Sequence, residues 1–188
     1  MIFTPTALAG VYLVEPERQH DARGFFARTY DADELRAHGL TPDISQCSVS
    51  YNSAAWTLRG LHYQTAPYAE VKLVRCTQGA IFDVVVDLRP TSPTYCQWVS
   101  AELTAENRLQ LYVPEGCAHG FLTLTDAAEV FYQISAAYRP EAGAGVRWND
   151  PAFGIRWPRE PAVIAERDAG YPDYVRLAAT GRTGAGSP

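Results

Sequence analysis

The stretch VKLVRCTQGAIFDVVVDLRPTSPT, residues 71–94, constrains the fold of this chain more than any other. It contains two apolar runs on either side of a Gln-Gly pair, a pattern that predicts a β-hairpin. Side chains alternate along a strand, so Lys72, Val74 and Cys76 share one face of the first expected strand. The hairpin therefore sets a β architecture in the middle of the chain.

Short segments of the same kind, separated by Gly, Pro and Asp, run through most of the sequence. Strands do not alternate with helices, which disfavours a doubly wound parallel sheet. We therefore expect an all-β fold, an antiparallel sandwich or barrel with the jelly roll among the candidates. The expected strands are 11–15, 24–30, 44–51, 57–64, 70–77, 80–88, 96–103, 109–113, 118–125 and 128–137.

One helix is expected at 32–38. Asp31 can cap its first turn, Glu34 takes the capping-box position and Gly39 ends it. Beyond about residue 140 the pattern is irregular, and the stretch WNDPAFGIRWP is typical of a packed loop.

The composition is globular, with 47% apolar and 20% charged residues and a net charge of −5. Because there is no large basic excess, we expect neither nucleic acid nor a membrane as a partner, although one basic pocket would suffice for a small anionic substrate. No apolar run approaches the ~18 residues that span a membrane, and the N-terminus lacks a signal-peptide pattern. The length of 188 residues favours one domain, which we place at 1–174, with a flexible tail at 175–188.

Cysteine is sparse, and no two cysteines form a CxxC pair. We expect all of them to be reduced and packed, which favours a cytoplasmic enzyme. The four are Cys47, Cys76, Cys96 and Cys117.

Charged residues interrupt the apolar runs of the hairpin. Lys72 lies in the first run, and Asp83 and Asp87 share a face of the second with Ile81 and Val85. Such charges are costly to bury unless they are paired or face a cavity. For the two aspartates, a solvated strand edge stays open as the alternative.

Two of the four histidines, His62 and His119, each enter an apolar strand, whereas His20 and His38 lie in polar stretches. A metal site is one alternative, but a three-histidine site would have to recruit His20 or His38. The other is acid–base chemistry: a histidine removes a proton near neutral pH, a tyrosine returns one, and a lysine stabilises an oxyanion. Such a set suits proton abstraction beside a ketone on a phosphorylated substrate. The candidate residues are His62, Tyr132, Lys72, Arg59, His119 and Asp168.

Ordered motifs over about residues 1–174 resemble those of the dTDP-4-dehydrorhamnose 3,5-epimerase family. The resemblance implies the cupin fold, a double-stranded β-helix or jelly roll, with a few short helices. The motifs are DARGFF (21–26), SVSYN (48–52), LRGLHYQ (58–64), the hairpin stretch (71–94), YVPEGCAHGF (112–121), VFYQISAAY (130–138), WNDPAFGIRWP (148–158) and ERDAGYP (166–172).

The resemblance also implies an activity: epimerisation at C3 and/or C5 of a nucleotide-diphosphate-linked 4-keto-6-deoxyhexose. The expected conversion is dTDP-4-dehydro-6-deoxy-D-glucose to dTDP-4-dehydro-L-rhamnose, in deoxysugar and polysaccharide biosynthesis. His62 would be the general base, supported by Asp168. Tyr132 would be the acid on the opposite face, and Lys72 would stabilise the enolate oxygen at C4.

For binding, the resemblance implies that Arg59, His119 and Arg167 hold the diphosphate. The nucleotide would be contacted by Arg23 and Gln46, with Tyr138 stacked on the base. No metal and no cofactor would be needed, because the substrate ketone already acidifies its neighbouring C–H bonds. The family forms homodimers in which N-terminal segments complete the partner's site. A non-catalytic sugar-nucleotide-binding cupin and a metal-dependent cupin enzyme stay open as alternatives.

Some positions depart from the usual family residues. They include Arg28, Ser48, Gly143 and the Trp56-Thr57 pair, all expected in the nucleotide or outer sugar shell. We expect Arg28 to form a surface ion pair.

The motif LRGLHYQ raises a problem of geometry. Arg59 and His62 are three positions apart, so a regular strand would point them to opposite faces, yet the implied site needs both near one ligand. Gly60, which lies between them, predicts a bulge or twist that brings them together.

Overall fold

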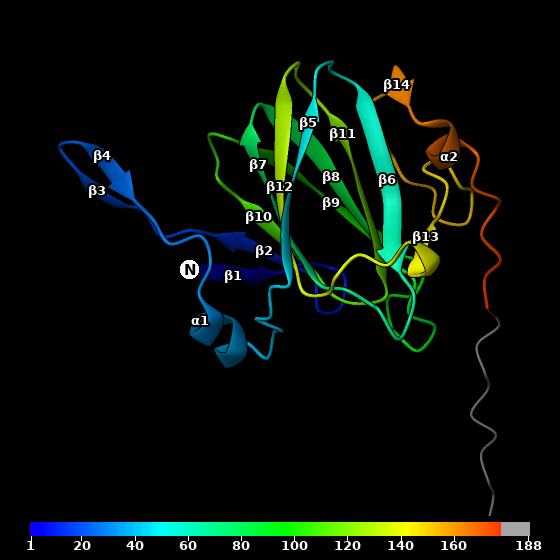
Figure 1. The fold of residues 1–188 in the computed structure, drawn as a ribbon, viewed down its shortest axis with the longest axis horizontal. Helices are drawn as coiled ribbons and strands as arrows, with labels where there is room; N and C mark the ends of the chain where they lie inside the picture. The colour runs from blue at the N-terminus through cyan, green and yellow to red at the C-terminus, as the bar shows by residue number, and fades with distance from the viewer. Residues whose placement is uncertain (178–188) are drawn as a thin grey trace, which may run out of the picture.

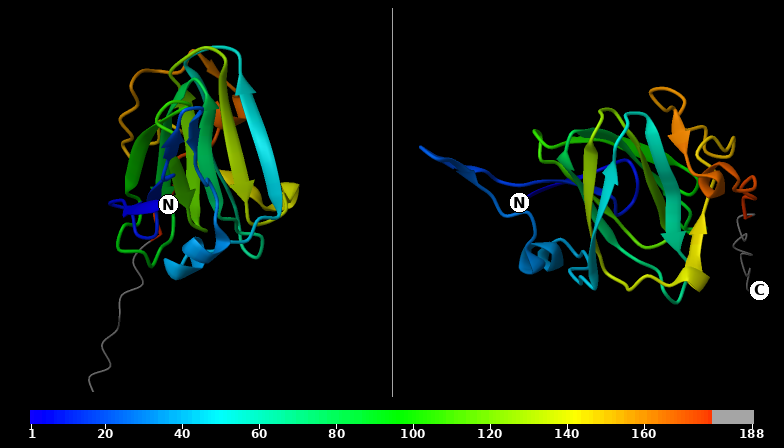
Figure 2. Two further views of the ribbon diagram at one scale, coloured as in Figure 1. Left: turned by 90° about the vertical axis from the view of Figure 1, so that its left-hand side faces the viewer. Right: turned by 45° about the horizontal axis from the view of Figure 1, so that its top comes forward.

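The computed structural model describes residues 1–177, in which two antiparallel sheets face each other (Figures 1 and 2). The first sheet has the order β1 (Ile2–Pro5), β2 (Tyr12–Glu15), β10 (Gln110–Val113), β7 (Lys72–Gln78), β12 (Ala128–Ile134) and β5 (Gln46–Asn52). The second has the order β13 (Gly143–Gly145), β6 (Thr57–Gln64), β11 (Cys117–Thr123), β8 (Ala80–Asp87) and β9 (Trp98–Thr104), and β14 (Val163–Ile164) joins β6 in parallel. The predicted antiparallel sandwich is confirmed.

A small hairpin of β3 (Gln19–Asp21) and β4 (Gly24–Phe26) extends away from the sandwich as an arm (Figure 1). All six of its strand residues are exposed, and the Phe26 side chain is 69% exposed. The arm is therefore held by few contacts with its own chain.

The predicted helix is present as α1 (Ala32–Ala37), and Asp31 caps it by accepting from the amides of Asp33 and Glu34. The capping-box role expected of Glu34 was wrong, because its carboxylate instead accepts from the amino group of Met1. The few short helices implied by the family resemblance include two whose positions the sequence did not indicate: the 3-10 turn Pro140–Ala142 and α2 (Glu166–Ala169).

The main core lies between the sheets, where the inward faces of the strands meet. Its largest members include Leu8, Ile81, Leu103, Leu111 and Phe121, none more than 1% exposed. Val74 and Cys76 pack in this core while Lys72, on the same face of β7, lies at a cavity, as the alternation predicted.

The stretch 148–158 packs over the outer face of the second sheet, as expected of a packed loop. Phe153 and Trp157 contact a second apolar cluster that contains Leu61, Val84 and Val86. The indole of Trp157 also donates to the carbonyl of Trp148 at 2.8 Å. This loop therefore fixes the chain segment that precedes α2.

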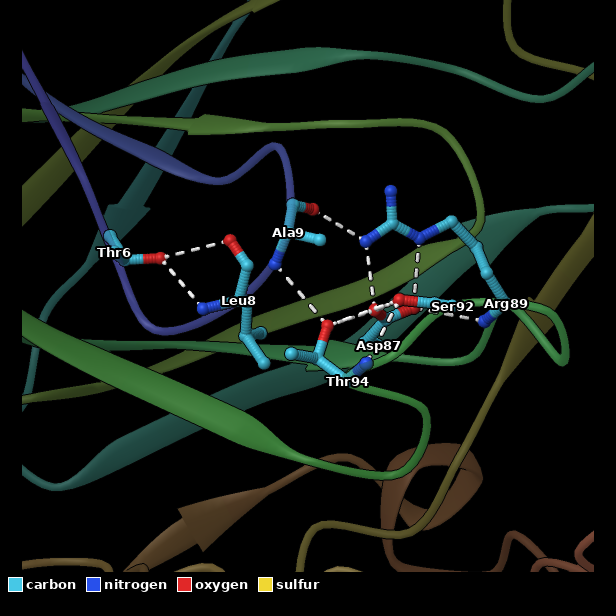
Figure 3. Close-up of polar contacts among 7 residues, drawn as sticks. All are labelled: Thr6, Leu8, Ala9, Asp87, Arg89, Ser92 and Thr94. Carbon is cyan, nitrogen blue, oxygen red and sulfur yellow. Dashed lines mark hydrogen bonds and ion pairs between the residues drawn. The ribbon is translucent and has the colours of Figure 1, made fainter.

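Asp83 and Asp87 do not lie at a solvated edge, since both are fully buried. Asp87 is the centre of a polar network shown in Figure 3, in which it accepts from Arg89 at 2.8 Å and from Ser92 and Thr94. Arg89 also donates to the carbonyl of Ala9, so the network ties the loop after β8 to the N-terminal segment.

The remaining expectations were met in part. Every predicted strand overlaps an observed one, whereas β1, β3, β13 and β14 were missed.

All four cysteines are free, but the expectation that all are packed was wrong, because Cys47 is exposed on β5. No helix within residues 1–177 is both long and apolar enough to cross a membrane. The tail expected at 175–188 falls mostly on 178–188, outside the described residues.

We predict that Asp87→Asn lowers the free energy of unfolding by about 2 kcal/mol at pH 7, because it leaves Arg89 without its charged partner. Urea unfolding at a fixed protein concentration measures the change. The exposed Asp43→Asn is the control, with an expected change within about 0.5 kcal/mol.

The pH dependence gives a second measurement on the same variant. Burial acts to raise the pKa of Asp87, but hydrogen bonds from Arg89, Ser92 and Thr94 outweigh it and hold the pKa below its ordinary value. A lowered pKa contributes stability that is present above the unfolded-state pKa and lost as the pH falls through the folded-state pKa. The difference between wild type and variant should thus narrow below about pH 4; an equal difference at pH 3 and pH 7 would contradict this account.

Candidate active site

A cavity of about 790 Å³ opens between the two sheets, a volume typical of a small-molecule site. The first sheet contributes β5, β7 and β12 to its walls, the second contributes β6 and β11, and the segment 163–168 forms one side. Nine of the ten predicted site residues line it: Gln46, Arg59, His62, Lys72, His119, Tyr132, Tyr138, Arg167 and Asp168.

The bulge predicted at Gly60 is confirmed. His119 and Phe121 of β11 pair with His62 and Arg59 of β6, so two steps along one strand match three along the other. Gly60 has φ +127°, a backbone conformation that side chains disfavour. The extra residue brings Arg59 and His62 to the same cavity.

His62 and Asp168 form a hydrogen-bonded pair at the cavity wall. His62 Nε2 lies 2.7 Å from Asp168 Oδ1, and the other carboxylate oxygen accepts from the Gly60 amide at 3.1 Å. Burial acts to raise the pKa of Asp168, but these hydrogen bonds and the nearby Arg167 charge outweigh it and lower the pKa. The carboxylate therefore holds the proton on Nε2, and Nδ1 finds no partner among residues 1–177.

A second hydrogen-bonded pair lies beside the first, on the neighbouring strand of the same sheet. His119, the register partner of His62, places Nε2 at 2.7 Å from Asp83 Oδ1. Both side chains are at most 3% exposed, and burial raises the pKa of Asp83 against the opposing effects of His119 and Lys72. Asp83 thus orients the His119 ring.

Lys72 reaches from the first sheet towards the second. Its ammonium group donates to the carbonyl of His62 at 3.2 Å and lies 2.9 Å from the carboxylate of Glu70. Lys72 and Glu70 are 10% and 9% exposed in their side chains, so this ion pair is largely shielded from water. Sequence reasoning missed Glu70, although its spacing of two from Lys72 in an expected strand is a signal that could have found it.

Tyr132 lies on β12, with its ring 6.0 Å from that of His119 in an edge-on arrangement. Burial raises its pKa, the charge of Asp83 adds to the rise, and Arg59 opposes it. The phenol is therefore protonated at neutral pH and can donate a proton into the cavity.

Neutral acceptors hold the two cavity arginines. Arg59 donates to the Asn52 side chain at 2.7 Å and to the Tyr51 carbonyl at 3.3 Å. Arg167 donates to the Tyr171 hydroxyl at 2.8 Å. Asn52 and Tyr171 were both missed, since neither contact leaves a spacing signal in the sequence.

Gln46 and Tyr138 stand together at the mouth of the cavity. The Gln46 side-chain oxygen accepts from the backbone amide of Tyr138 at 2.6 Å, which leaves the Gln46 NH₂ group to face a ligand. The Tyr138 ring is 57% exposed and can stack on a flat group.

Arg23 is the one predicted residue that the structure does not bring to this cavity. It lies at the tip of the arm, 89% exposed, and pairs with Asp21. Of the positions that depart from the family pattern, Ser48, Thr57 and Gly143 line the cavity. Arg28 instead forms the expected surface ion pair, 2.9 Å from Asp31.

The two other histidines lie outside the cavity. His20 lies on the arm against Phe25, and His38 stacks on Phe3 at 4.1 Å. The three-histidine site considered from the sequence is therefore not assembled. Within the part of the chain that the structure describes, no three His, Cys, Asp or Glu side chains are grouped to hold a metal ion.

The chain that forms this cavity is similar in sequence to proteins of known activity. The family model of dTDP-4-dehydrorhamnose 3,5-epimerase matches residues 5–175. A curated epimerase of that name from Sinorhizobium fredii is 43% identical over 178 residues, which cover 94% of this chain and 91% of the relative.

Solved structures agree in both fold and sequence. The dTDP-4-dehydrorhamnose 3,5-epimerase from Bacillus anthracis, with TDP and PPi bound, has a TM-score of 0.88 and 40% identity, covering 92% of this chain and 99% of that one. The dTDP-6-deoxy-D-glucose-3,5-epimerase from Legionella pneumophila, in complex with dTDP-4-keto-L-rhamnose, has a TM-score of 0.84 and 35% identity, covering 90% of each chain. The expected cupin fold is thereby confirmed, and the chain belongs to the dTDP-4-dehydrorhamnose 3,5-epimerase family, as an isomerase that acts on a dTDP-linked 4-keto-6-deoxyhexose.

Proposed function

We propose that His62, Tyr132, Lys72 and Asp168 carry out the epimerisation, with dTDP-4-dehydro-6-deoxy-D-glucose as substrate and dTDP-4-dehydro-L-rhamnose as product. The observation that carries this proposal is the placement of base and acid on opposite sheets. His62 comes from β6 of the second sheet, and Tyr132 from β12 of the first, around one cavity. A proton removed on one face of the sugar ring and returned on the other inverts the carbon.

His62 is the general base in this scheme. Asp168 fixes the proton on Nε2, so Nδ1 carries the lone pair that accepts the proton from C3 or C5. The imidazolium that forms is stabilised by the same carboxylate. Asp168 is 5% exposed and accepts from the Gly60 amide, which fixes its carboxylate beside His62.

Lys72 stabilises the negative charge that develops on the C4 oxygen when the neighbouring proton leaves. Two of its three N–H bonds are directed to Glu70 and His62, which leaves the third for the substrate. An ammonium group aimed before the reaction begins costs no reorganisation in the transition state.

Tyr132 completes the reaction by returning a proton from the opposite wall. Its raised pKa keeps the phenol protonated until the carbanion accepts the proton. The two inversions use the same four residues, applied in turn to C3 and C5, once His62 has released its proton to water and Tyr132 has taken one up.

The nucleotide diphosphate fits the cationic side of the cavity. Arg59, His119 and Arg167 are the diphosphate ligands in this proposal, because guanidinium and imidazole N–H groups can donate to phosphate oxygens. Gln46 contacts the nucleotide, and Tyr138 stacks on the base. The cytoplasmic location expected from the sequence stays a prediction.

Arg23 reaches the nucleotide only if a second copy of the chain supplies it. The arm that carries it is exposed along both strands and projects from the sandwich (Figure 1). We therefore include a homodimer in the proposal, in which each arm enters the partner's cavity and places Arg23 there.

His62→Asn should lower deuterium exchange from D₂O into C3 and C5 of the substrate by about 10³-fold, because the base is gone. NMR measures the exchange, and calorimetry with dTDP should show binding within about twofold of wild type. His38→Asn, outside the cavity, is the control and should exchange normally. Persistent exchange in His62→Asn would rule out His62 as the base.

Tyr132→Phe should separate exchange from inversion. Without the acid, His62 returns a proton to the face from which it came, so exchange continues while product formation falls by about 10²-fold. Chromatographic analysis of product beside the NMR exchange assay tests this. Equal losses of exchange and product would contradict the assignment of Tyr132 as the acid.

Arg23→Ala should lower kcat/KM by about tenfold, because one phosphate or nucleotide contact is lost. Mixing it with His62→Asn distinguishes the partner's arm from the chain's own. After chain exchange, half of the dimers are mixed and each has one intact site, so activity should recover to about a quarter of wild type. Activity that stays at the mean of the two variants would contradict arm exchange; Arg36→Ala, an exposed arginine on α1, is the control.

A further inference from the structure

Tyr171, which follows α2, occupies a space that a glycine leaves open. Gly145 of β13 is the register partner of His62, and a Cβ atom there would lie 2.3 Å from the Tyr171 ring. The phenol ring therefore rests on the bare backbone of β13. From there it meets the His62 ring edge-on, at 6.3 Å between ring centroids.

The hydroxyl end of the same side chain holds Arg167. Arg167 Nε donates to the Tyr171 oxygen at 2.8 Å, and the guanidinium carbon lies 5.8 Å from the ring centroid. Arg167 is exposed on a helix of four residues, and no carboxylate pairs with it among the described ion pairs. Tyr171 is the main contact that restricts its long side chain, with a smaller contribution from the Tyr138 side chain.

We propose that Tyr171 is a positioning residue, which fixes the Arg167 guanidinium at the cavity for the diphosphate of the substrate. This inference rests on the proposed function, because it takes Arg167 as a diphosphate ligand. Tyr171 acts through Arg167 and does not itself line the cavity.

The choice of a phenol as the acceptor has a physical reason. A carboxylate would also orient Arg167, but it would cancel the charge that the diphosphate needs and would repel the phosphate oxygens. The phenol oxygen is neutral, so it aligns the guanidinium and leaves its charge in place. Holding the side chain before binding also reduces the rotamer entropy lost when the ligand arrives.

Tyr171→Phe tests this, because it removes the hydroxyl and keeps the ring on Gly145. We expect KM for the dTDP-sugar and Kd for dTDP to rise about tenfold, with kcat within about twofold of wild type. Binding of deoxythymidine, which lacks the diphosphate, should not change. The control is Tyr68→Phe, since Tyr68 also carries an arginine over its ring, Arg139 at 5.4 Å, but lies outside the cavity lining.

Gly145→Ala provides a second route to the same result. Its methyl group would displace the Tyr171 ring without altering the phenol, so Kd for dTDP should again rise at least tenfold. Combining it with Tyr171→Phe should add little, because both changes break one contact. A full, additive loss in the double variant would overturn the inference.

Arg167→Gln separates failure of this inference from failure of the proposed function. If Arg167→Gln weakens dTDP binding and Tyr171→Phe does not, Arg167 binds the diphosphate without help, and the positioning role is wrong. If Arg167→Gln itself leaves dTDP binding unchanged, the diphosphate role of Arg167 is wrong, and the inference falls with it. The expected result is a double variant Arg167→Gln/Tyr171→Phe no weaker than Arg167→Gln alone.

Discussion

The cavity depends on one extra residue in β6. At Gly60 the strand gains a bulge, with φ +127°, and approaches β11 so closely that a Cβ atom on Gly60 would lie 2.5 Å from Gly120 Cα. Gly120 is equally constrained, since its Cβ would lie 2.6 Å from the Arg59 carbonyl oxygen. Only two facing glycines allow the strands to meet in this way.

The same bulge organises the groups on either side of it. Arg59 and His62 reach one cavity because the bulge adds one residue to β6 relative to β11. The Gly60 amide is directed to Asp168, which in turn holds His62. A local backbone feature thus sets the position of a cation, an imidazole and a carboxylate at once. This explains why a cation and a titratable ring occur so close together in an apolar strand.

The strands of the sandwich could be predicted from the sequence because their apolar runs and turn residues are local signals. The four missed strands are two to four residues long and lie at sheet edges or on the arm, where little apolar burial marks them. Helix α2 has four residues and no side-chain cap, so its sequence carries no pattern that predicts a helix. Most site residues could be named from the family motifs. The role of Tyr171 could not, since it depends on a space above Gly145 that exists only once β13 has paired with β6.

The basic side chains of the cavity have two kinds of partner, and this has a consequence for how a ligand enters. Lys72 and His62, the proposed catalytic groups, each have a carboxylate beside them, Glu70 and Asp168, and His119 has Asp83. Arg59 and Arg167 are held by neutral oxygens only. The two arginines flank the hydrogen bond between Gly60 and Asp168, so two guanidinium groups lie near a single carboxylate, and positive charge is in excess on that side of the cavity. A long molecule with an anionic end and an uncharged end then has one favoured direction of entry, because the placement of charges in the protein distinguishes the two ends of such a molecule.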